Sequence, residues 1–331
     1  MPTDYNVRCT YRDGKWGDIE VSDSEYIPMH IAASCLHYGQ ESFEGLKAFR
    51  GKDGKIRIFR MEENAKRFIR SAEGIKMQPM PVELFCEMVK KVVKLNERFI
   101  PPYGTGASLY IRPLEIGISP RVGVKPASEY MVVMLVTPVG PYFKEGFKPT
   151  RVCMSREYDR VAPKGTGSIK VGGNYAASLL GEYTGIDHGC QQVCFVDAAT
   201  KTYLEELGGM NMMVVHKDGH VETPSLTGNI LPGVTRRSLI QLIQDNGHDV
   251  VETMIALDQL LEDIKSGEVT EVFACGTAAI ITPIGRFKSE KFDVTVADGG
   301  SGEFTLALRN QLLGIQLGEI EDPHNWMWKV C

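Results

Sequence analysis

The sequence lacks the features of several large protein classes. No apolar run approaches the ~18 residues of a transmembrane helix, and the first residues lack the charged and apolar regions of a signal peptide. There is no long basic run and the net charge is −5, which argues against nucleic acid or an anionic membrane as the main partner. The eight cysteines show no C-x-x-C spacing, so we expect buried, reduced thiols in a cytoplasmic protein and no metal site.

Two common phosphate-binding motifs are also missing. The glycine-rich stretch 165–175 contains no Gly-x-x-x-x-Gly-Lys-Ser/Thr sequence, so the spacing of a phosphate-binding loop is absent. In the same stretch, Gly165-x-Gly167 is followed by Lys170 where a dinucleotide-binding fingerprint needs a glycine. This stretch therefore needs another interpretation.

Residues 165–175 place one lysine, Lys170, among four glycines, with Asn174 and Tyr175 directly after it. Glycines allow a planar ligand to approach the backbone closely, and a lysine that loses water there favours its neutral form. Neutral lysine is the form that condenses with an aldehyde to make a Schiff base. The alternative is a flexible, solvated turn, which is the usual character of a Gly-Lys loop.

The length of 331 residues, with 43% apolar and 24% charged residues, suits a water-soluble protein with two domains. The clearest linker lies within 138–149, which is rich in proline, glycine and lysine. We predict an α/β protein with a smaller N-terminal domain over 1–140, a linker over 141–151 and a larger C-terminal domain over 152–331.

Hydrophobic periodicity predicts individual elements along the chain. Helices are expected over 62–74, 82–99, 174–184, 234–244 and 304–317, and strands over 108–112, 130–136, 192–196, 210–215 and 271–275. A hairpin is expected at 47–60, because two strand-like runs flank the turn Gly51-Lys52-Asp53-Gly54.

Two glycine-led segments have the composition of phosphate-binding sites. Gly233-Val234-Thr235 begins a predicted helix, where free N–H groups and the positive end of the helix dipole favour an anion. Gly276-Thr277-Ala278 follows a predicted strand and offers a hydroxyl group and further amides. Either signal alone is weak, because most such helix starts bind only water. Arg67, on another predicted helix, is by default a solvated surface charge.

Two other groupings carry chemistry. Glu205-Glu206 precedes a glycine turn, where carboxylates are usually solvated; a buried one needs a cationic partner, such as a protonated pyridine nitrogen. Tyr110-x-Arg112 alternates along a predicted strand, so both side chains face the same side of the sheet. A phenol and a guanidinium side by side suit a carboxylate ligand, although the same pair also occurs on half-exposed sheet faces.

Seven motifs occur in an order that resembles the branched-chain amino acid aminotransferases, which are pyridoxal-phosphate enzymes of fold type IV. They are His37-Tyr38 and the segments 43–49, 108–113, 140–143, 170–175, 231–236 and 276–278. The resemblance covers about residues 30–320. It implies a two-domain α/β (α+β) fold of type IV, with pyridoxal 5'-phosphate between a smaller N-terminal and a larger C-terminal domain.

The resemblance also implies a role for each matching residue. Lys170 matches the lysine that binds the cofactor covalently and later moves the substrate α-proton. Cofactor contacts fall on Tyr175 (ring oxygen), Glu206 (pyridine nitrogen), and Arg67, Val234, Thr235 and Thr277 (phosphate). Substrate contacts fall on Tyr110, Thr277 and Ala278 (α-carboxylate), Arg112 (distal carboxylate of glutamate), and Phe43, Tyr38, Tyr142 and Val122 (apolar wall).

The implied reaction is a transamination between leucine, isoleucine or valine and 2-oxoglutarate, in a homodimer whose subunits share active sites through Tyr38 and the loop 122–124. A D-amino acid aminotransferase and an aminodeoxychorismate lyase have the same fold, and a non-catalytic pyridoxal-phosphate-binding protein is a further alternative. Two departures from the family pattern are visible. Gly209 stands where many members have threonine, and no cysteines occur at Ala279 and Thr282, where mammalian members carry a redox C-x-x-C.

Overall fold

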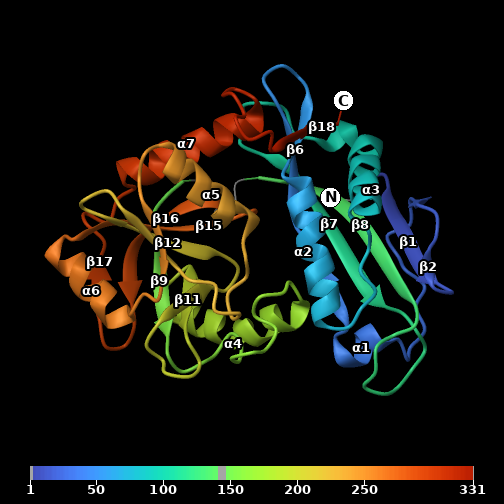
Figure 1. Cartoon of the computed structure of the whole chain (residues 1–331), viewed down its shortest axis with the longest axis horizontal. Helices are drawn as coiled ribbons and strands as arrows, with labels where there is room; N and C mark the ends of the chain where they lie inside the picture. The colour runs from blue at the N-terminus through green and yellow to red at the C-terminus, as the bar shows by residue number, and fades with distance from the viewer. Residues whose placement is uncertain (1–2, 141–146, 331) are drawn as a thin grey trace. The chain divides into compact units, whose positions relative to one another are not determined.

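The computed structural model describes residues 3–140 and 147–330. The described residues form two compact units, each with its own sheet (Figure 1). The first unit comprises Met1–Pro141, Ile169–Gly172 and Leu313–Cys331, and the second comprises Tyr142–Ser168 and Gly173–Leu312. The prediction of one C-terminal domain over 152–331 is therefore corrected at 169–172 and 313–331, because both segments pack on the first unit.

An antiparallel sheet forms the base of the first unit, and its described strands follow the order β18-β6-β5-β7-β8-β1-β2. β3 pairs with β1, and β4 pairs with β7. The strands are β1 (Asn6–Arg12), β2 (Lys15–Trp16), β3 (Glu20–Ser22), β4 (Glu41–Phe43), β5 (Leu46–Arg50), β6 (Ile56–Phe59), β7 (Ser108–Gly117), β8 (Tyr130–Val139) and β18 (Met327–Lys329).

The two long helices of the first unit are α2 (Met61–Gly74) and α3 (Val82–Leu95), and they pack together beside the sheet (Figure 1). Their buried rings Phe68 and Phe85 lie 5.3 Å apart between centroids. α3 begins directly after Pro81 and is followed by the short η1 (Glu97–Phe99). The helix predicted over 62–74 is confirmed, whereas the one predicted over 82–99 ends earlier and tightens into a 3-10 turn. A further short helix, α1 (Ser34–Tyr38), precedes β4.

The predicted hairpin at 47–60 is confirmed as β5 and β6, with Ala48 opposite Ile58. Its outer edge is covered by β18, which pairs Trp328 with Ile58 and was not predicted. The ring of Trp326 packs edge-on against Phe59 at 5.7 Å between centroids. These contacts explain why the C-terminal residues belong to the first unit.

The second unit contains a mixed sheet, whose described strands follow the order β11-β10-β9-β16-β15-β12-β13-β14, with β17 on β16. β9 pairs in parallel with both β10 and β16, and β13 pairs in parallel with β14. The strands are β9 (Thr150–Ser155), β10 (Gln192–Val196), β11 (Leu204–Leu207), β12 (Asn211–His216), β13 (Val221–Pro224), β14 (Val250–Thr253), β15 (Val269–Gly276), β16 (Ile280–Lys288) and β17 (Asp293–Thr295).

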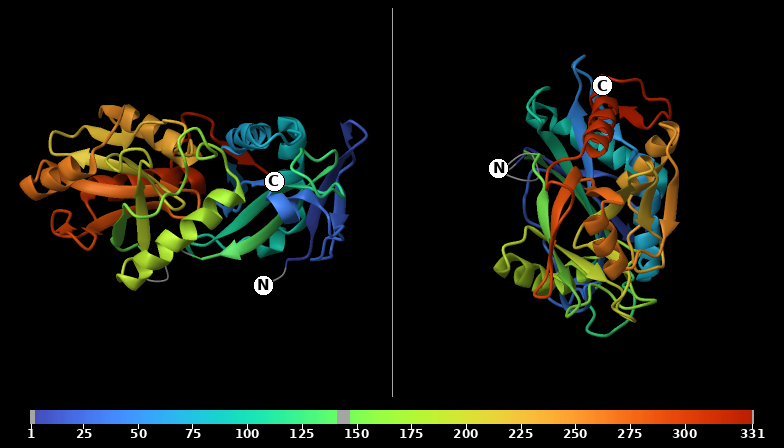
Figure 2. Two further views of the ribbon diagram at one scale, coloured as in Figure 1. Left: turned by 90° about the horizontal axis from the view of Figure 1, so that it is seen from below. Right: turned by 90° about the vertical axis from the view of Figure 1, so that its left-hand side faces the viewer.

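Helices cover both faces of this sheet, because side chains alternate along β9 and β10. Val152 and Cys194 face the main core together with α6 (Leu257–Ser266). The opposite side chains, including Phe195, lie beside α4 (Gly172–Asp187), where Gly181 allows close approach (Figure 2). The remaining helices are α5 (Val234–Asp245) and α7 (Glu303–Leu317). None of the helices in the described residues is both long and apolar enough to cross a membrane.

One carboxyl group of the first unit is buried without a partner among the described residues. Glu115 on β7 is fully buried, and neither of its carboxyl oxygens makes a hydrogen bond there. Ser42, its register partner on β4, likewise has a buried hydroxyl without a hydrogen bond to the described part of the chain. Burial raises the pKa of Glu115 well above its usual range. The folded protein therefore holds this proton more tightly than the unfolded chain does.

We expect Glu115→Gln to remove a loss of stability at rising pH. The raised folded-state pKa makes stability fall as the pH rises from the unfolded value of 4.5 towards the folded one. Glutamine stays neutral, so at pH 8 the variant should exceed the wild type by about 1–3 kcal/mol in unfolding free energy. Urea unfolding at pH 5 and pH 8 measures this, with the exposed Glu87→Gln as the control. Equal pH slopes for Glu115→Gln and the wild type would contradict it.

Candidate functional site

Lys170 lies in the short segment of the first unit whose backbone is held from two elements. The N–H of Phe43, at the end of β4, donates to the Lys170 carbonyl at 3.0 Å. The N–H of Lys170 donates to Ser71 Oγ on α2 at 2.9 Å. The neighbouring Ile169 packs on Gly74, where a Cβ would come within 2.7 Å of its side chain. Residues far apart in sequence thus fix the position of Lys170.

The ammonium group of Lys170 lies in surroundings that disfavour its charge. Its Nζ stands 4.8 Å from the centroid of the Phe43 ring. Burial and then the Arg67 guanidinium lower the pKa of Lys170 to about 8, with Glu44 and Tyr110 opposing the shift. The prediction that desolvation moves this lysine towards its neutral form is confirmed.

Arg67 is buried in an ion pair, so the default expectation of a solvated surface charge is wrong. Its Nε lies 2.7 Å from Glu44 Oε1 and its Nη2 lies 2.9 Å from Oε2. Asn64 on the same helix donates to Glu44 Oε2 at 2.7 Å. Burial alone would raise the pKa of Glu44, but the adjacent Arg67 outweighs it and lowers that pKa. Glu44 was present in the sequence motif 43–49 but was not predicted as a site residue.

Tyr110 and Arg112 lie together on β7, as their alternation predicts. Arg112 Nη2 donates to the Tyr110 hydroxyl at 3.1 Å, and the guanidinium lies 4.6 Å from the centroid of Phe43. The Nε of Arg112 is buried and makes no hydrogen bond within the described chain. Gly45 is required here, because a Cβ at this position would clash with the Tyr110 hydroxyl. Phe43, Tyr110, Arg112 and Lys170 therefore form one cluster, which has an unused donor for an anionic group.

The remaining predicted residues of the first unit are exposed. Tyr38 is 41% exposed at the end of α1, and Val122 is 73% exposed in the loop that follows β7. This loop lies beside the segment before α1, since Arg121 N–H donates to the Ala32 carbonyl at 2.8 Å. Tyr142 lies outside the described residues.

In the second unit, Glu206 on β11 is buried and ionically paired. Arg160 Nη2 lies 2.8 Å from Glu206 Oε1, which also accepts the Leu231 N–H at 3.0 Å. Asn211 donates to Oε2 at 3.0 Å. The usual solvated character of carboxylates before a glycine turn is therefore wrong here, and the required cationic partner is present. Arg160 was not predicted, because it lies in an irregular segment with no recognisable spacing.

Tyr175 is in the first turn of α4, and the stretch before it is tied to that turn. Thr166 Oγ1 donates to Asn174 Oδ1 at 2.6 Å, and Asn174 Nδ2 donates to the Thr166 carbonyl at 2.8 Å. Gly209 lies near the phenol ring, since a Cβ there would be 3.9 Å from Tyr175 Cε1. That is an ordinary contact, so a threonine would fit and Gly209 leaves space beside the ring.

Two chain segments of the second unit present backbone amides. α5 begins at Val234 after the N-cap residue Gly233, with no side-chain cap and no acidic residue in its first turn, where Thr235 is buried. This arrangement leaves amides and the positive helix end available to an anion. Thr277 and Ala278 lie in the turn between β15 and β16, which closes with Ile280 at a φ of 64°. That backbone is strained for a β-branched residue, and such strain concentrates at functional sites.

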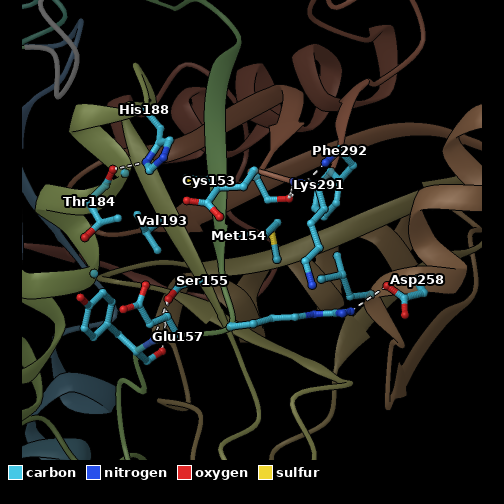
Figure 3. A pocket seen from close by; sticks show the side chains of 17 residues that line it. Cys153, Met154, Ser155, Glu157, Thr184, His188, Val193, Asp258, Lys291 and Phe292 are labelled. Carbon is cyan, nitrogen blue, oxygen red and sulfur yellow. Dashed lines mark hydrogen bonds and ion pairs between the residues drawn. The ribbon is translucent and has the colours of Figure 1, made fainter.

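A separate cavity of about 450 Å³ lies in the second unit (Figure 3). It is lined by Cys153, Thr184, His188, Asp258, Lys291 and others, and none of the predicted site residues is among them. A hydrogen bond from the Cys190 thiol, assisted by His188 and Lys288, lowers the pKa of Cys153 to about 6. This cavity is chemically distinct from the cluster around Lys170.

Comparison with known proteins places the chain. The family model for class IV amino-transferases matches residues 41–287. The chain belongs to the class IV aminotransferase family. It is 45% identical to the branched-chain-amino-acid aminotransferase of Mycolicibacterium smegmatis, over 99% of this chain and 90% of that protein.

Two solved structures of the family share the fold. The branched-chain amino acid aminotransferase of Escherichia coli matches with a TM-score of 0.82 and 28% identity, over 99% of this chain and 100% of that one. The T.th. enzyme, complexed with N-(5'-phosphopyridoxyl)-L-glutamate, matches with a TM-score of 0.78 and 27% identity over 100% of both chains. The predicted family and the predicted two-domain α/β fold of type IV are thereby confirmed.

The lowered pKa of Lys170 predicts that Lys170→Met stabilises the cofactor-free class IV fold at pH 7. The folded-state pKa of about 8 lies below the ordinary 10.5, so the folded protein carries an unfavourable charge at lower pH. This cost is complete below about pH 8 and disappears as the pH rises to the unfolded value. The expected gain at pH 7 is roughly 2–3 kcal/mol, allowing for solvent at the partly exposed side chain.

Urea unfolding of the cofactor-free protein at pH 7 and pH 10 measures this gain, which should shrink at the higher pH. Lys66→Met is the matched control, because Lys66 lies on the surface of α2 in an exposed ion pair. The same gain from both substitutions, or a loss of stability in Lys170→Met at pH 7, would contradict the prediction.

Proposed function

We propose that the protein is a pyridoxal-phosphate-dependent aminotransferase that exchanges the amino group between branched-chain L-amino acids and 2-oxoglutarate. The observation that carries this proposal is the cluster of Lys170, Phe43, Tyr110 and Arg112. It combines a lysine of lowered pKa, an aromatic face and a guanidinium with an unused buried donor. The names of the relatives in this family support the same substrate class.

The donor groups fit pyridoxal 5'-phosphate part by part. An aldehyde matches the amine of Lys170, and a pyridine nitrogen matches the buried Glu206. A phosphate matches the uncapped start of α5 at Val234 and Thr235. Further phosphate contacts are proposed for Arg67 and Thr277, and a contact to the ring oxygen for Tyr175. When bound, the cofactor supplies an electron sink for the electrons released as the substrate α-proton leaves.

Within this proposal, Lys170 carries the proton between substrate carbon atoms. Its Nζ is neutral in a substantial fraction of molecules near the pKa of about 8, so it can accept the α-proton. Glu206 must stay ionised in order to hold a proton on the pyridine nitrogen. The ion pair with Arg160 and the two amide donors stabilise that ionised form without any ligand.

Substrate choice rests on an apolar surface beside one arginine. Phe43 offers an aromatic face to an aliphatic side chain, whose burial is worth roughly 2 kcal/mol. For glutamate, the distal carboxylate would bind Arg112, whose buried Nε makes no hydrogen bond to any residue that the structure describes. The α-carboxylate is assigned to Tyr110 and to the amides of Thr277 and Ala278. One site could thus serve two chemically different amino donors.

The test is an assay of Arg112→Leu with leucine and with glutamate as separate amino donors. We expect the kcat/KM for glutamate to fall by an amount equivalent to about 2–5 kcal/mol, because a charged carboxylate loses its partner. Leucine, which makes no such pair, is the internal control and should be affected far less. An equal loss for both donors would show that Arg112 has a structural role. A wild type inactive with L-leucine and 2-oxoglutarate, or active with D-leucine, would contradict the proposed function itself.

The proposal includes a homodimer in which each subunit completes its partner's site. Several apolar side chains of the first unit are strongly exposed around α1 and the loop after β7. They are Ile31 (83%), Leu36 (62%), Val122 (73%) and Val124 (85%). An isolated chain gains nothing from this exposure, whereas an interface would bury it. We therefore assign Tyr38 and Val122 to the apolar wall of the neighbouring subunit's pocket.

A complementation experiment tests the shared site. Lys170→Ala lacks the nucleophile and Val122→Trp should block the partner's pocket, so each homodimer should be nearly inactive. A co-expressed heterodimer contains one site with an intact lysine and an intact loop, and activity should return. Val251→Trp, at another exposed apolar position, controls for the bulk of tryptophan. An inactive heterodimer of folded, cofactor-loaded chains would show that the loop serves its own subunit.

A further inference from the structure

The hairpin of β12 and β13 carries a cluster of polar side chains that no step of the proposed reaction uses. His216 ends β12, His220 closes the turn, and Glu222 lies on β13. The turn is held by two backbone hydrogen bonds, from His216 N–H to the His220 carbonyl at 3.0 Å and from Gly219 N–H to the His216 carbonyl at 2.9 Å. The register of β12 and β13 therefore fixes where these three side chains start.

The three side chains converge on one point. The imidazole rings of His216 and His220 stack with centroids 4.1 Å apart and planes inclined by 10°. His216 Nε2 lies 3.4 Å from Glu222 Oε2. One ring nitrogen of each histidine and one carboxylate oxygen of Glu222 all lie within 4.8 Å of one another.

The donor atoms are available for a ligand. The Nε2 of His216 is buried and makes no hydrogen bond within residues 3–140 and 147–330, although it faces a carboxylate. On His220, the other ring nitrogen is engaged, since Nδ1 lies 2.6 Å from Asp218 Oδ1. A carboxylate that accepts the Nδ1 proton fixes the tautomer and leaves a lone pair on Nε2, the usual arrangement behind a metal-bound histidine.

We propose that His216, His220 and Glu222 bind a divalent transition-metal ion, with zinc as the best match to the donor set. Two imidazoles and a carboxylate, with water in the fourth position, form a common tetrahedral zinc site. Zn–N bonds of about 2.0–2.1 Å place donors roughly 3.4 Å apart, which is the distance already seen between His216 and Glu222. Side-chain rotation of His220 is enough to complete the site.

The chemistry also discriminates between ions. Magnesium and calcium prefer sites made of oxygen ligands, whereas imidazole nitrogen favours zinc and its neighbours among the transition metals. A bound ion would replace the contact between two stacked imidazoles by two bonds to a shared cation. It would also connect the end of β12 to β13 across the turn, so zinc should raise the unfolding temperature of this hairpin's unit.

The experiment uses the tag-free holoenzyme after dialysis against EDTA. Zinc is titrated in competition with a chromophoric chelator, and one high-affinity ion per chain is expected. His216→Gln and His220→Gln should abolish this binding, and Asp218→Asn should weaken it by about 10- to 100-fold, because it only orients His220. His248→Gln is the matched control, since His248 contacts the same turn through Gly219 but is not part of the cluster.

Cobalt(II) provides an independent spectroscopic signature. Its visible bands should be intense, as in a tetrahedral nitrogen and oxygen site, and the near-ultraviolet charge-transfer band of a thiolate ligand should not appear. The visible bands should vanish in His220→Gln, a variant of a partly exposed residue whose fold is checked by urea unfolding. Binding that is equal in wild type and both histidine variants, a thiolate band, or no stoichiometric zinc in the wild type would overturn the proposal. Transamination of leucine is measured in parallel, and its loss alone would concern the proposed function and not the metal site.

Discussion

The desolvation of Lys170 is the interaction on which the candidate site depends. A lysine in water is almost entirely protonated at neutral pH, and a protonated amine is neither a nucleophile nor a base. Here burial and the positive charge of Arg67 act in the same direction and bring the pKa to about 8. The backbone of Lys170 is bonded to Phe43 and Ser71, so the side chain cannot easily leave these surroundings. The first unit thus carries a charge that is unfavourable for stability and useful for chemistry.

Buried ion pairs make this arrangement possible in both units. Glu44 lies between the requirements of Arg67 and Lys170: it compensates the guanidinium, yet leaves the shift of the lysine in place. In the second unit, Arg160 compensates Glu206 in the same way. Removing one member of such a pair leaves an uncompensated buried charge, which costs more than the pair contributes. We therefore regard Glu44 and Arg160 as positioning residues for the groups that contact the cofactor and the substrate.

Much of the fold and part of the site follow from local sequence patterns. The hairpin at 47–60, the helix at 62–74 and the contact between Tyr110 and Arg112 depend on spacing within one element, and spacing is visible in the sequence. The partners of these elements are not. Arg160 meets Glu206, and Glu44 meets Arg67, only because distant segments fold together. The strand β18 has three residues, too few to show a period, and the histidine cluster on the β12–β13 hairpin depends on the register of two strands.

The covalent attachment site of the cofactor is the most direct test of this account. Reduction of the holoenzyme with borohydride, followed by peptide mapping, identifies the lysine that is linked to pyridoxal phosphate. The account predicts a single modified peptide that carries the adduct on Lys170. An adduct on Lys47, the other lysine buried in the first unit, or on Lys164 or Lys201 would contradict the assignment of Lys170 as the nucleophile.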